Sequence, residues 1–284
     1  LSSLTILSGL SGSGKTSIAI QVALGVAIKL KENDMMGCVS IHELESTVRA
    51  WRLTKRMASM LSGVSWSDIE DGKSNSYDVS RYRTAIEFIK TLPIYINDSD
   101  NQTSAHVITT SNALHLQSGP LWLTVSDYLE QFKDQWGNAE GKQQTAEELR
   151  VSRIGRNHVT VASQTGASVI LISQVTIDER NNPSLLAGAS NLRYSKALEH
   201  AADVVLEVYN PPQMHSKGRK FILPREHGIS DEKKAWFCIW KYREGKEGVF
   251  PIDWKPNLTT FADPMLSNGK VFQTTMFGNE GGDF

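Results

Sequence analysis

The sequence predicts an α/β fold in which a mainly parallel central sheet is flanked by helices and ends in an antiparallel C-terminal hairpin. Short apolar runs alternate with longer helical patterns through most of the 284 residues. Such alternation implies crossover connections between parallel strands, with helices on both faces of the sheet. The last two apolar runs instead flank a short polar turn, Arg243-Glu244-Gly245-Lys246, which predicts a hairpin at one edge.

The individual elements follow from this alternation in chain order. Strands are predicted at residues 4–8, 38–41, 94–96, 121–125, 168–173, 203–209, 235–241 and 247–252. Helices are predicted at residues 15–31, 46–61, 78–91, 103–117, 144–164 and 194–201. Three stretches, 130–143, 175–192 and 210–234, are predicted to be irregular. The first two follow buried strands, where parallel sheets usually carry their functional loops.

The composition is that of a globular protein, with 40% apolar and 21% charged residues, and the chain is long enough to bury a core without disulfides. Cys38 and Cys238 each lie in an apolar run, so we expect buried thiols, a reducing compartment and a cytoplasmic location. The longest apolar stretch, 18–30, is too short to cross a membrane, and no signal peptide is expected.

We expect one domain over residues 1–263 and a flexible polar and acidic tail over residues 264–284. The chain begins directly with strand-like sequence, so we expect it to be one domain of a longer protein or a shortened version of one. The net charge of −1 excludes a polycation that coats nucleic acid by bulk attraction. Nucleic-acid binding would therefore need a local cluster of basic groups.

Residues 9–16 read Gly-Leu-Ser-Gly-Ser-Gly-Lys-Thr, a complete phosphate-loop motif between a predicted strand and a predicted helix. Its glycines let successive backbone amides point at phosphate oxygens, and the helix N-terminus adds its dipole. Lys15 supplies a positive charge to the β- and γ-phosphates, and the Thr16 hydroxyl is a Mg²⁺ ligand. We therefore expect ATP and Mg²⁺ as ligands, with nucleotide contacts from Ser11, Gly12, Ser13, Gly14, Lys15, Thr16 and Ser17.

Acidic and amide side chains follow the neighbouring strands. Asp127 comes directly after the apolar run 120–126 and is predicted to be the second metal ligand, because a buried carboxylate needs a cation or partner. Glu45 and Glu43 are both placed to activate water, and spacing alone does not choose between them. Gln174 follows the strand at 168–173 and suits a role in sensing water or the γ-phosphate.

At this point the motifs resemble the C-terminal, RecA-like motor domain of DnaB-family replicative helicases. Five segments follow the family's order and cover nearly the whole chain: 44–45 ("SLEM"), 127–129 ("DYLQ"), 172–174 ("LSQ"), 192–203 ("LRESGSIEQDAD") and 241–245 ("KQRNG"). The resemblance implies that Glu45, rather than Glu43, is the catalytic glutamate. Here Glu43 replaces the family's serine and Glu130 its glutamine.

The resemblance also implies a homo-hexameric ring with ATP sites at subunit interfaces. Arg243 would act as an arginine finger on a neighbour's γ-phosphate, with Lys241 beside it; a guanidinium suits the charge of that transition state. Arg193, Tyr194 and Lys196 fall where the family grips single-stranded DNA. Primase, a helicase loader and a polymerase are the further partners that the family implies.

Two functional alternatives remain open at this stage. A RecA/RadA-type recombinase shares the phosphate loop and the sheet, whereas a KaiC-like scaffold ATPase would bind proteins and hydrolyse ATP slowly. The basic run 217–220 could contact nucleic acid, but its sequence is more typical of a solvated charged surface.

Overall fold

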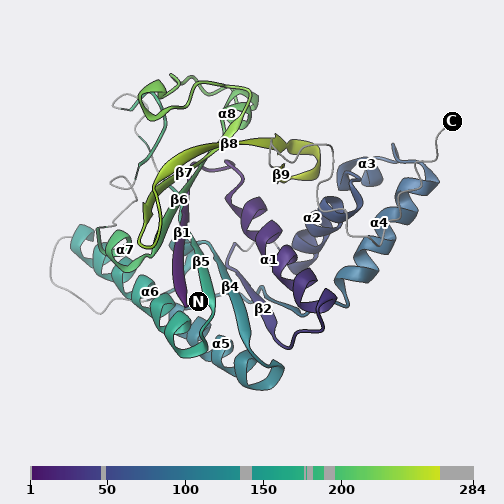
Figure 1. Cartoon of the computed structure of the whole chain (residues 1–284), viewed down its shortest axis with the longest axis horizontal. Helices are drawn as coiled ribbons and strands as arrows, with labels where there is room; N and C mark the ends of the chain where they lie inside the picture. The colour runs from purple at the N-terminus through teal and green to yellow at the C-terminus, as the bar shows by residue number, and fades with distance from the viewer. Residues whose placement is uncertain are drawn as a thin grey trace.

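The computed structural model describes residues 2–45, 49–134, 143–175, 177, 182–188 and 196–262. Nine strands form one sheet in the order β3-β2-β4-β5-β1-β6-β7-β8-β9. The six strands from β3 to β6 are mutually parallel, and β7, β8 and β9 continue the sheet in antiparallel pairs (Figure 1). The predicted parallel sheet with an antiparallel C-terminal hairpin is therefore confirmed.

All eight predicted strands are present, and a ninth follows them. Their bounds are β1 Ser3–Ser8, β2 Cys38–Glu43, β3 Ile94–Asn97, β4 Leu121–Asp127, β5 Ser168–Ile172, β6 Val204–Tyr209, β7 Ala235–Tyr242, β8 Gly248–Lys255 and β9 Thr260–Ala262. The final strand was not predicted because three residues are too few to show an alternating pattern.

The six predicted helices are also present in the described residues. The α-helices are α1 Lys15–Glu32, α2 Ala50–Ser62, α3 Trp66–Glu70, α4 Ser76–Ile89, α5 Ser104–Ser118, α6 Gln143–Thr165, α7 Lys196–Ala201 and α8 Pro211–Ser216. Short 3₁₀ turns occur at η1 Leu129–Gln131, η3 Arg225–His227 and η4 Pro256–Leu258. Within the part of the chain described, no helix has both the length and the apolar character needed to cross a membrane.

Helices cover both faces of the sheet, and the core is divided accordingly. Strand β1 shows why: Leu4 and Ile6 point to one face, whereas Leu7 points to the other, as the two-residue period of a strand requires. One core lies between the sheet and α1, α2 and α4, and the second lies between the sheet and α5, α6 and α7 (Figure 1). This sandwich fixes the carboxyl ends of the parallel strands at one edge.

The stretch 210–234, predicted to be irregular, begins with the short helix α8. Asn210 starts this helix by accepting a hydrogen bond from the Gln213 backbone N–H, and Pro211 occupies the first helical turn, where its missing N–H costs little. A third apolar cluster, which includes Tyr209, Met214 and Trp236, packs this stretch onto β6 and β7. The segment is therefore anchored to the sheet beside the phosphate loop.

Candidate nucleotide site

The phosphate loop connects the end of β1 to the start of α1. Gly12 and Gly14 have φ angles of +79° and +105°, which favour glycine. A Cβ at Gly12 would lie 1.8 Å from Lys217 Nζ, and one at Gly14 would lie 2.6 Å from the Phe261 ring. The loop thus follows the tight path needed to turn its amides toward an anion at the helix N-terminus.

Lys15 is the first residue of α1 and is only 6% exposed. Its Nζ donates hydrogen bonds to the carbonyl oxygens of Gly9 and Leu10, both at 2.9 Å. Burial lowers the pKa of Lys15 to about 8, while the nearby carboxylates of Asp127 and Glu130 act in the opposite direction. The Lys15 ammonium group is therefore held within the phosphate loop, where it is predicted to bind phosphate.

Thr16 and Asp127, which the sequence predicts to be metal ligands, are in contact. Thr16 Oγ1 donates a hydrogen bond of 2.5 Å to Asp127 Oδ2. Asp127 is the last residue of β4 and is 6% exposed, and burial raises the pKa of its carboxyl while the Thr16 hydrogen bond opposes that shift. A hydroxyl and one carboxylate fit Mg²⁺, which binds through few protein oxygens together with phosphate and water.

Glu43 and Glu45 occupy different environments at the end of β2. Glu43 is the last residue of the strand, pairs in register with Asp127 and is 3% exposed. Burial and the neighbouring charge of Asp127 raise the pKa of Glu43, and its Oε1 accepts a hydrogen bond of 3.0 Å from the Glu45 backbone N–H. Glu45 is exposed, and both residues line the same cavity.

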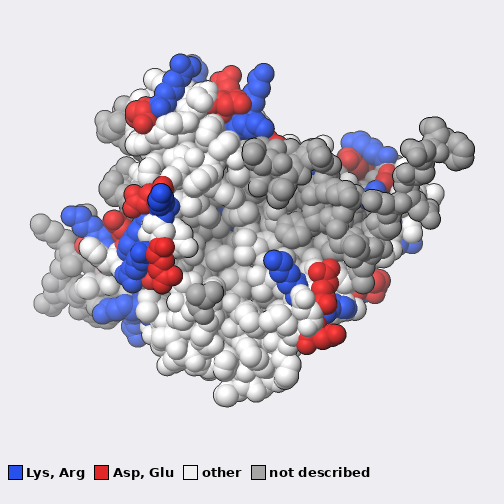
Figure 2. Space-filling model, viewed as in Figure 1, with Lys and Arg blue, Asp and Glu red and all other residues white. Residues whose placement is uncertain are grey.

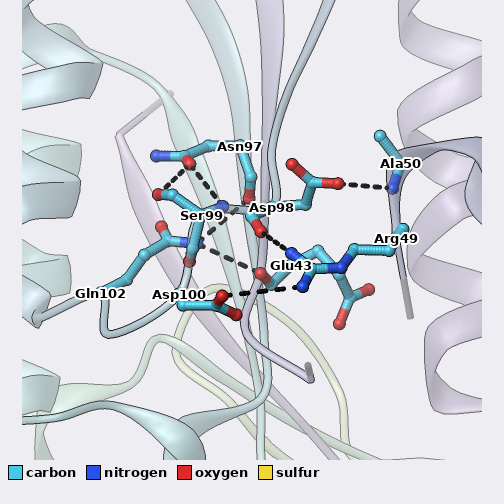
Figure 3. A network of polar contacts seen from close by, with 8 residues as sticks. All are labelled: Glu43, Arg49, Ala50, Asn97, Asp98, Ser99, Asp100 and Gln102. Atoms are coloured by element: carbon cyan, nitrogen blue, oxygen red, sulfur yellow. Dashed lines mark hydrogen bonds and ion pairs between the residues drawn. The ribbon is translucent and has the colours of Figure 1, made fainter. Parts of the chain in front are cut away.

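A polar network fixes the chain on both sides of Glu45 (Figure 3). On one side, Gln102 Nε2 donates to three carbonyl oxygens, each at 3.1 Å: those of Glu43, of Asn97 at the end of β3 and of Ser99 in the loop after it. On the other, Asp98 Oδ2 accepts from the Ala50 backbone N–H at 3.0 Å, and Arg49 Nη1 donates to the Asp98 carbonyl at 3.1 Å. The end of β2, the loop after β3 and the start of α2 are thereby tied together.

Glu130 orders the chain after β5. The Gln174 backbone N–H donates to Glu130 Oε1 at 3.1 Å, and Ser173 Oγ donates to the same oxygen at 3.0 Å. Burial raises the pKa of Glu130, and these hydrogen bonds lower it. Gln174 itself lines the cavity, as predicted from its place after the strand.

These groups surround one cavity of about 290 Å³. The predicted residues Ser11, Gly12, Gly14, Lys15, Thr16, Ser17, Glu45, Asp127 and Gln174 all line it. Ser13 belongs to the same loop, but its side chain is buried and points away from this cavity toward Gly9.

Sequence reasoning missed five further residues that line the cavity: Tyr128, which directly follows the predicted ligand Asp127, and Arg56, Gln213, Trp254 and Thr259. Arg56 lies on the basic helix α2, where a positive charge facing three carboxylates could have been suspected. The last three come from segments more than 190 residues after the phosphate loop, and no local pattern connects them with it.

Lys241 and Arg243 lie away from this cavity. They are near the start of β6, at the opposite end of the parallel strands from the phosphate loop. The Lys241 side chain donates to the Glu199 carbonyl, and Arg243 Nη1 forms a 3.0 Å ion pair with Asp203 Oδ1. Asp203 directly precedes β6. The phosphate loop follows Ser8 of β1, which pairs with Glu207 near the other end of β6. Asp203 and Glu207 are four residues apart along the chain, which is a distance of about 13 Å in an extended strand.

Comparison with known proteins identifies the family to which the chain belongs. The sequence model of the DnaB-like helicase C terminal domain family matches residues 1–263. The chain belongs to this family. The DnaB-like assignment does not favour the recombinase or the KaiC-like scaffold ATPase.

Relatives and solved structures agree with the family. The chain is 27% identical to the replicative DNA helicase DnaB of Geobacillus stearothermophilus over 208 residues, which are 73% of this chain and 43% of that protein. It is 23% identical to a probable replicative DNA helicase of Trieres chinensis, over 94% of this chain and 54% of the relative. The chain thus spans about half the length of these relatives.

The fold matches two solved structures. One, described as an ATPase domain, superposes with a TM-score of 0.74 at 19% identity, covering 92% of this chain and 84% of that one. The other, a DnaB-like replicative helicase described with its interactions with primase, gives a TM-score of 0.76 at 19% identity, covering 92% and 57%. The RecA-like α/β fold predicted from the sequence is thus confirmed.

The predicted DNA contacts of this DnaB-like domain are only partly within the described residues. Arg193 and Tyr194 lie outside them, and Lys196 is the exposed first residue of α7. The preceding segment is anchored by buried Glu207, whose carboxylate accepts from the backbone N–H groups of Ala187 and Gly188 at 2.9 and 3.0 Å. In Figure 2 positive and negative side chains lie side by side in small groups, so DNA binding would depend on local cations.

Proposed function

We propose that this chain is the ATP-driven motor domain of a replicative DNA helicase. It hydrolyses ATP at the interfaces of a homo-hexameric ring, translocates on single-stranded DNA and separates duplex. Membership of the DnaB-like family supports this proposal, as does the cavity that gathers the phosphate loop, Asp127 and Glu45 at one edge of the sheet. We place this activity in the cytoplasm of a bacterium or a phage-infected cell.

One observation carries the interfacial part of the proposal. The cavity contains the groups for binding phosphate and metal, but Lys241 and Arg243 lie at the other edge of the same sheet. A side chain tied to Asp203 cannot reach a γ-phosphate on its own chain's phosphate loop. We infer that Arg243 instead completes the site of a neighbouring subunit.

The chain's own residues then divide the work of hydrolysis. The loop amides and Lys15 hold the β- and γ-phosphates, and Thr16 and Asp127 would hold Mg²⁺, which would neutralise the negative charge that develops on the phosphates. Glu45 accepts the proton of the attacking water, and Gln174 senses the γ-phosphate through the segment that Glu130 holds. Arg243 of the adjacent copy stabilises charge on the γ-phosphate's equatorial oxygens.

The DNA and protein partners follow from the same proposal. Arg193, Tyr194 and Lys196 contact the backbone of single-stranded DNA, and repetition around a ring lines the channel with positive charge. One solved structure of a DnaB-like helicase is described with its interactions with primase. We propose primase, a loader or a polymerase as partners of the assembly that contains this chain.

The test is ATP hydrolysis with and without single-stranded DNA, over a range of protein concentrations at fixed salt. Turnover per chain should rise steeply with concentration, because each site needs two chains, and should increase when DNA is added. Strand displacement from a forked duplex should accompany it. Turnover that is independent of both concentration and DNA would contradict the proposal and indicate self-contained sites.

A further inference from the structure

Lys217, which belongs to the basic run 217–220, lies on the phosphate loop. It directly follows α8, and its Nζ donates to the Ser11 carbonyl oxygen at 3.3 Å. A Cβ built at Gly12 would lie 1.8 Å from the same atom, so the tip of the Lys217 side chain lies directly against the backbone of the loop. This lysine therefore reaches the loop over more than 200 residues of sequence, and it has no counterpart among the phosphate-loop motif residues.

The helix that carries Lys217 is fastened to the loop by a second contact. Asn210 is fully buried, and its Nδ2 donates to the Ser13 carbonyl oxygen at 3.0 Å. Its Oδ1 accepts from the Gln213 backbone N–H and starts α8. The buried side chain fixes the base of the helix, so the backbone of Lys217 lies beside the phosphate loop, while the Lys217 side chain itself is exposed.

The helix also takes part in the nucleotide cavity itself. Gln213 lines that cavity, and its Oε1 accepts from Trp254 Nε1 at 3.3 Å. Lys217 and Arg219 line a small adjoining hollow on the outer side of residues 10–13. In Figure 2 the Lys and Arg side chains at the α8 end of the molecule lie beside Asp and Glu side chains. Positive charge therefore extends from the inner side of the loop, at Lys15, to its outer side.

Two ammonium groups that contact carbonyls of one short loop repel each other. The charge of Lys217 adds to burial in lowering the pKa of Lys15. The carboxylates of Asp127 and Glu130 offset part of this repulsion at Lys15, and a polyphosphate is the further anion that a phosphate loop takes. The arrangement is thus better suited to the loaded site than to the empty chain.

We propose that Lys217 is a second lysine of the nucleotide site, which α8 supplies in cis to bind the phosphates of a nucleoside triphosphate. This inference rests on the proposed nucleotide-binding function and adds a contact that the phosphate-loop motif does not contain. The run 217–220 then serves the nucleotide rather than nucleic acid.

The experiment is a titration of the full chain with ATP and with ADP, each with Mg²⁺, by isothermal titration calorimetry. Lys217→Ala should weaken ATP binding about tenfold, the loss of one charge-assisted contact, and should weaken ADP binding less, because ADP carries less charge. Lys217→Arg should retain most of the affinity. Lys220→Ala removes an exposed charge of the same run and should leave binding unchanged.

A substitution by glutamine separates charge from simple bracing of the loop. Lys217→Gln keeps a donor for the Ser11 carbonyl but loses the charge, so it should bind ATP as weakly as Lys217→Ala. ATP affinity of the wild-type level in Lys217→Ala or Lys217→Gln would overturn the inference, while loss of binding in Lys15→Ala would show that the nucleotide site itself stands. A wild-type chain that binds no nucleotide would overturn both, and circular dichroism establishes that each variant is folded.

Discussion

Three carboxyl groups meet at the edge of the sheet above the phosphate loop, and each has a distinct environment. Asp127 accepts a hydrogen bond from Thr16, and Glu43 accepts one from the Glu45 backbone and is almost fully buried. Glu45 alone among the three is exposed to the cavity, where a water molecule could reach it. Their arrangement favours a structural task for Glu43 and proton transfer for Glu45.

We predict that Glu45→Gln lowers kcat by a factor on the order of 10² to 10⁴, the usual contribution of a general base, while nucleotide affinity persists. Glu43→Gln should change kcat by less than about tenfold, because the amide oxygen can still accept from the Glu45 N–H. Single-turnover ATP hydrolysis with saturating nucleotide measures both variants. A larger loss in Glu43→Gln than in Glu45→Gln would reverse the assignment.

At this scale the sequence predicted residues whose roles follow from local patterns. The loop 9–16 could be recognised because its spacing is itself the mechanism, and Asp127 because a carboxylate after an apolar strand needs a partner. The contact of Lys217 with Ser11 could not be predicted. It depends on how α8 packs on β6 and β7, and no short-range pattern in residues 210–234 encodes that packing.

Strand β4 and helix α6 are joined by a buried histidine as well as by apolar packing. His158 is fully buried, with its two ring nitrogens within hydrogen-bond distance of the Ile154 carbonyl, at 2.8 Å, and of Ser126 Oγ, at 2.9 Å. Burial lowers its pKa to about 4. The neutral imidazole thus links the helix to the residue directly before Asp127.

This linkage predicts a pH-dependent contribution of His158 to stability. The pKa is about 4 in the folded chain, against an ordinary value of 6.5 for a solvated histidine, so the unfolded chain binds more protons between these values. The stabilisation is present above pH 6.5 and is lost as the pH falls toward 4. The free energy by which His158→Gln destabilises the protein should therefore decrease by about 1–2 kcal/mol between about pH 7 and about pH 5.

Urea unfolding of the wild type and His158→Gln at both pH values measures this difference. Only the difference is informative, because the pKa values of buried Asp127 and Glu207 are raised, and these carboxyls shift overall stability in the opposite direction. An equal destabilisation at the two pH values would show that the imidazole does not titrate between them.

Elements with a long repeating pattern were predictable, whereas three of the shortest were not. Helix α1 and the strands of the parallel sheet have enough residues to show their periods. The five-residue α3, the six-residue α8 and the three-residue β9 do not complete two turns or two alternations. Their formation depends on tertiary packing, as with Phe261 of β9 against Gly14 of the phosphate loop.

For the molecule as a whole, the most important separation is between the cavity and the hairpin. We predict that Arg243→Ala lowers kcat by a factor on the order of 10³, as expected for a lost arginine finger, while ATP binding persists. Lys246→Ala removes an exposed charge from the same turn and serves as the matched control. A steady-state hydrolysis assay with single-stranded DNA measures both.

Mixing two inactive variants tests whether Arg243 acts on another chain. Subunits with Arg243→Ala retain Glu45, and subunits with Glu45→Gln retain Arg243, so mixed assemblies contain some interfaces with both residues. Turnover should reappear in the mixture and be greatest near equal amounts. A mixture that stays inactive at every ratio, although the chains co-assemble, would argue against action in trans.

The position of Arg243 also constrains the symmetry of any assembly. A chain that offers its nucleotide cavity at one edge and its arginine at the other meets its two neighbours through unlike surfaces. Such head-to-tail contacts close into a ring when the rotation between successive copies divides a full turn, and otherwise they continue as a helical filament. The rotation angle between copies depends on packing and not on catalysis. It then decides whether subunits with the same catalytic site form a ring around a DNA strand or a filament along it.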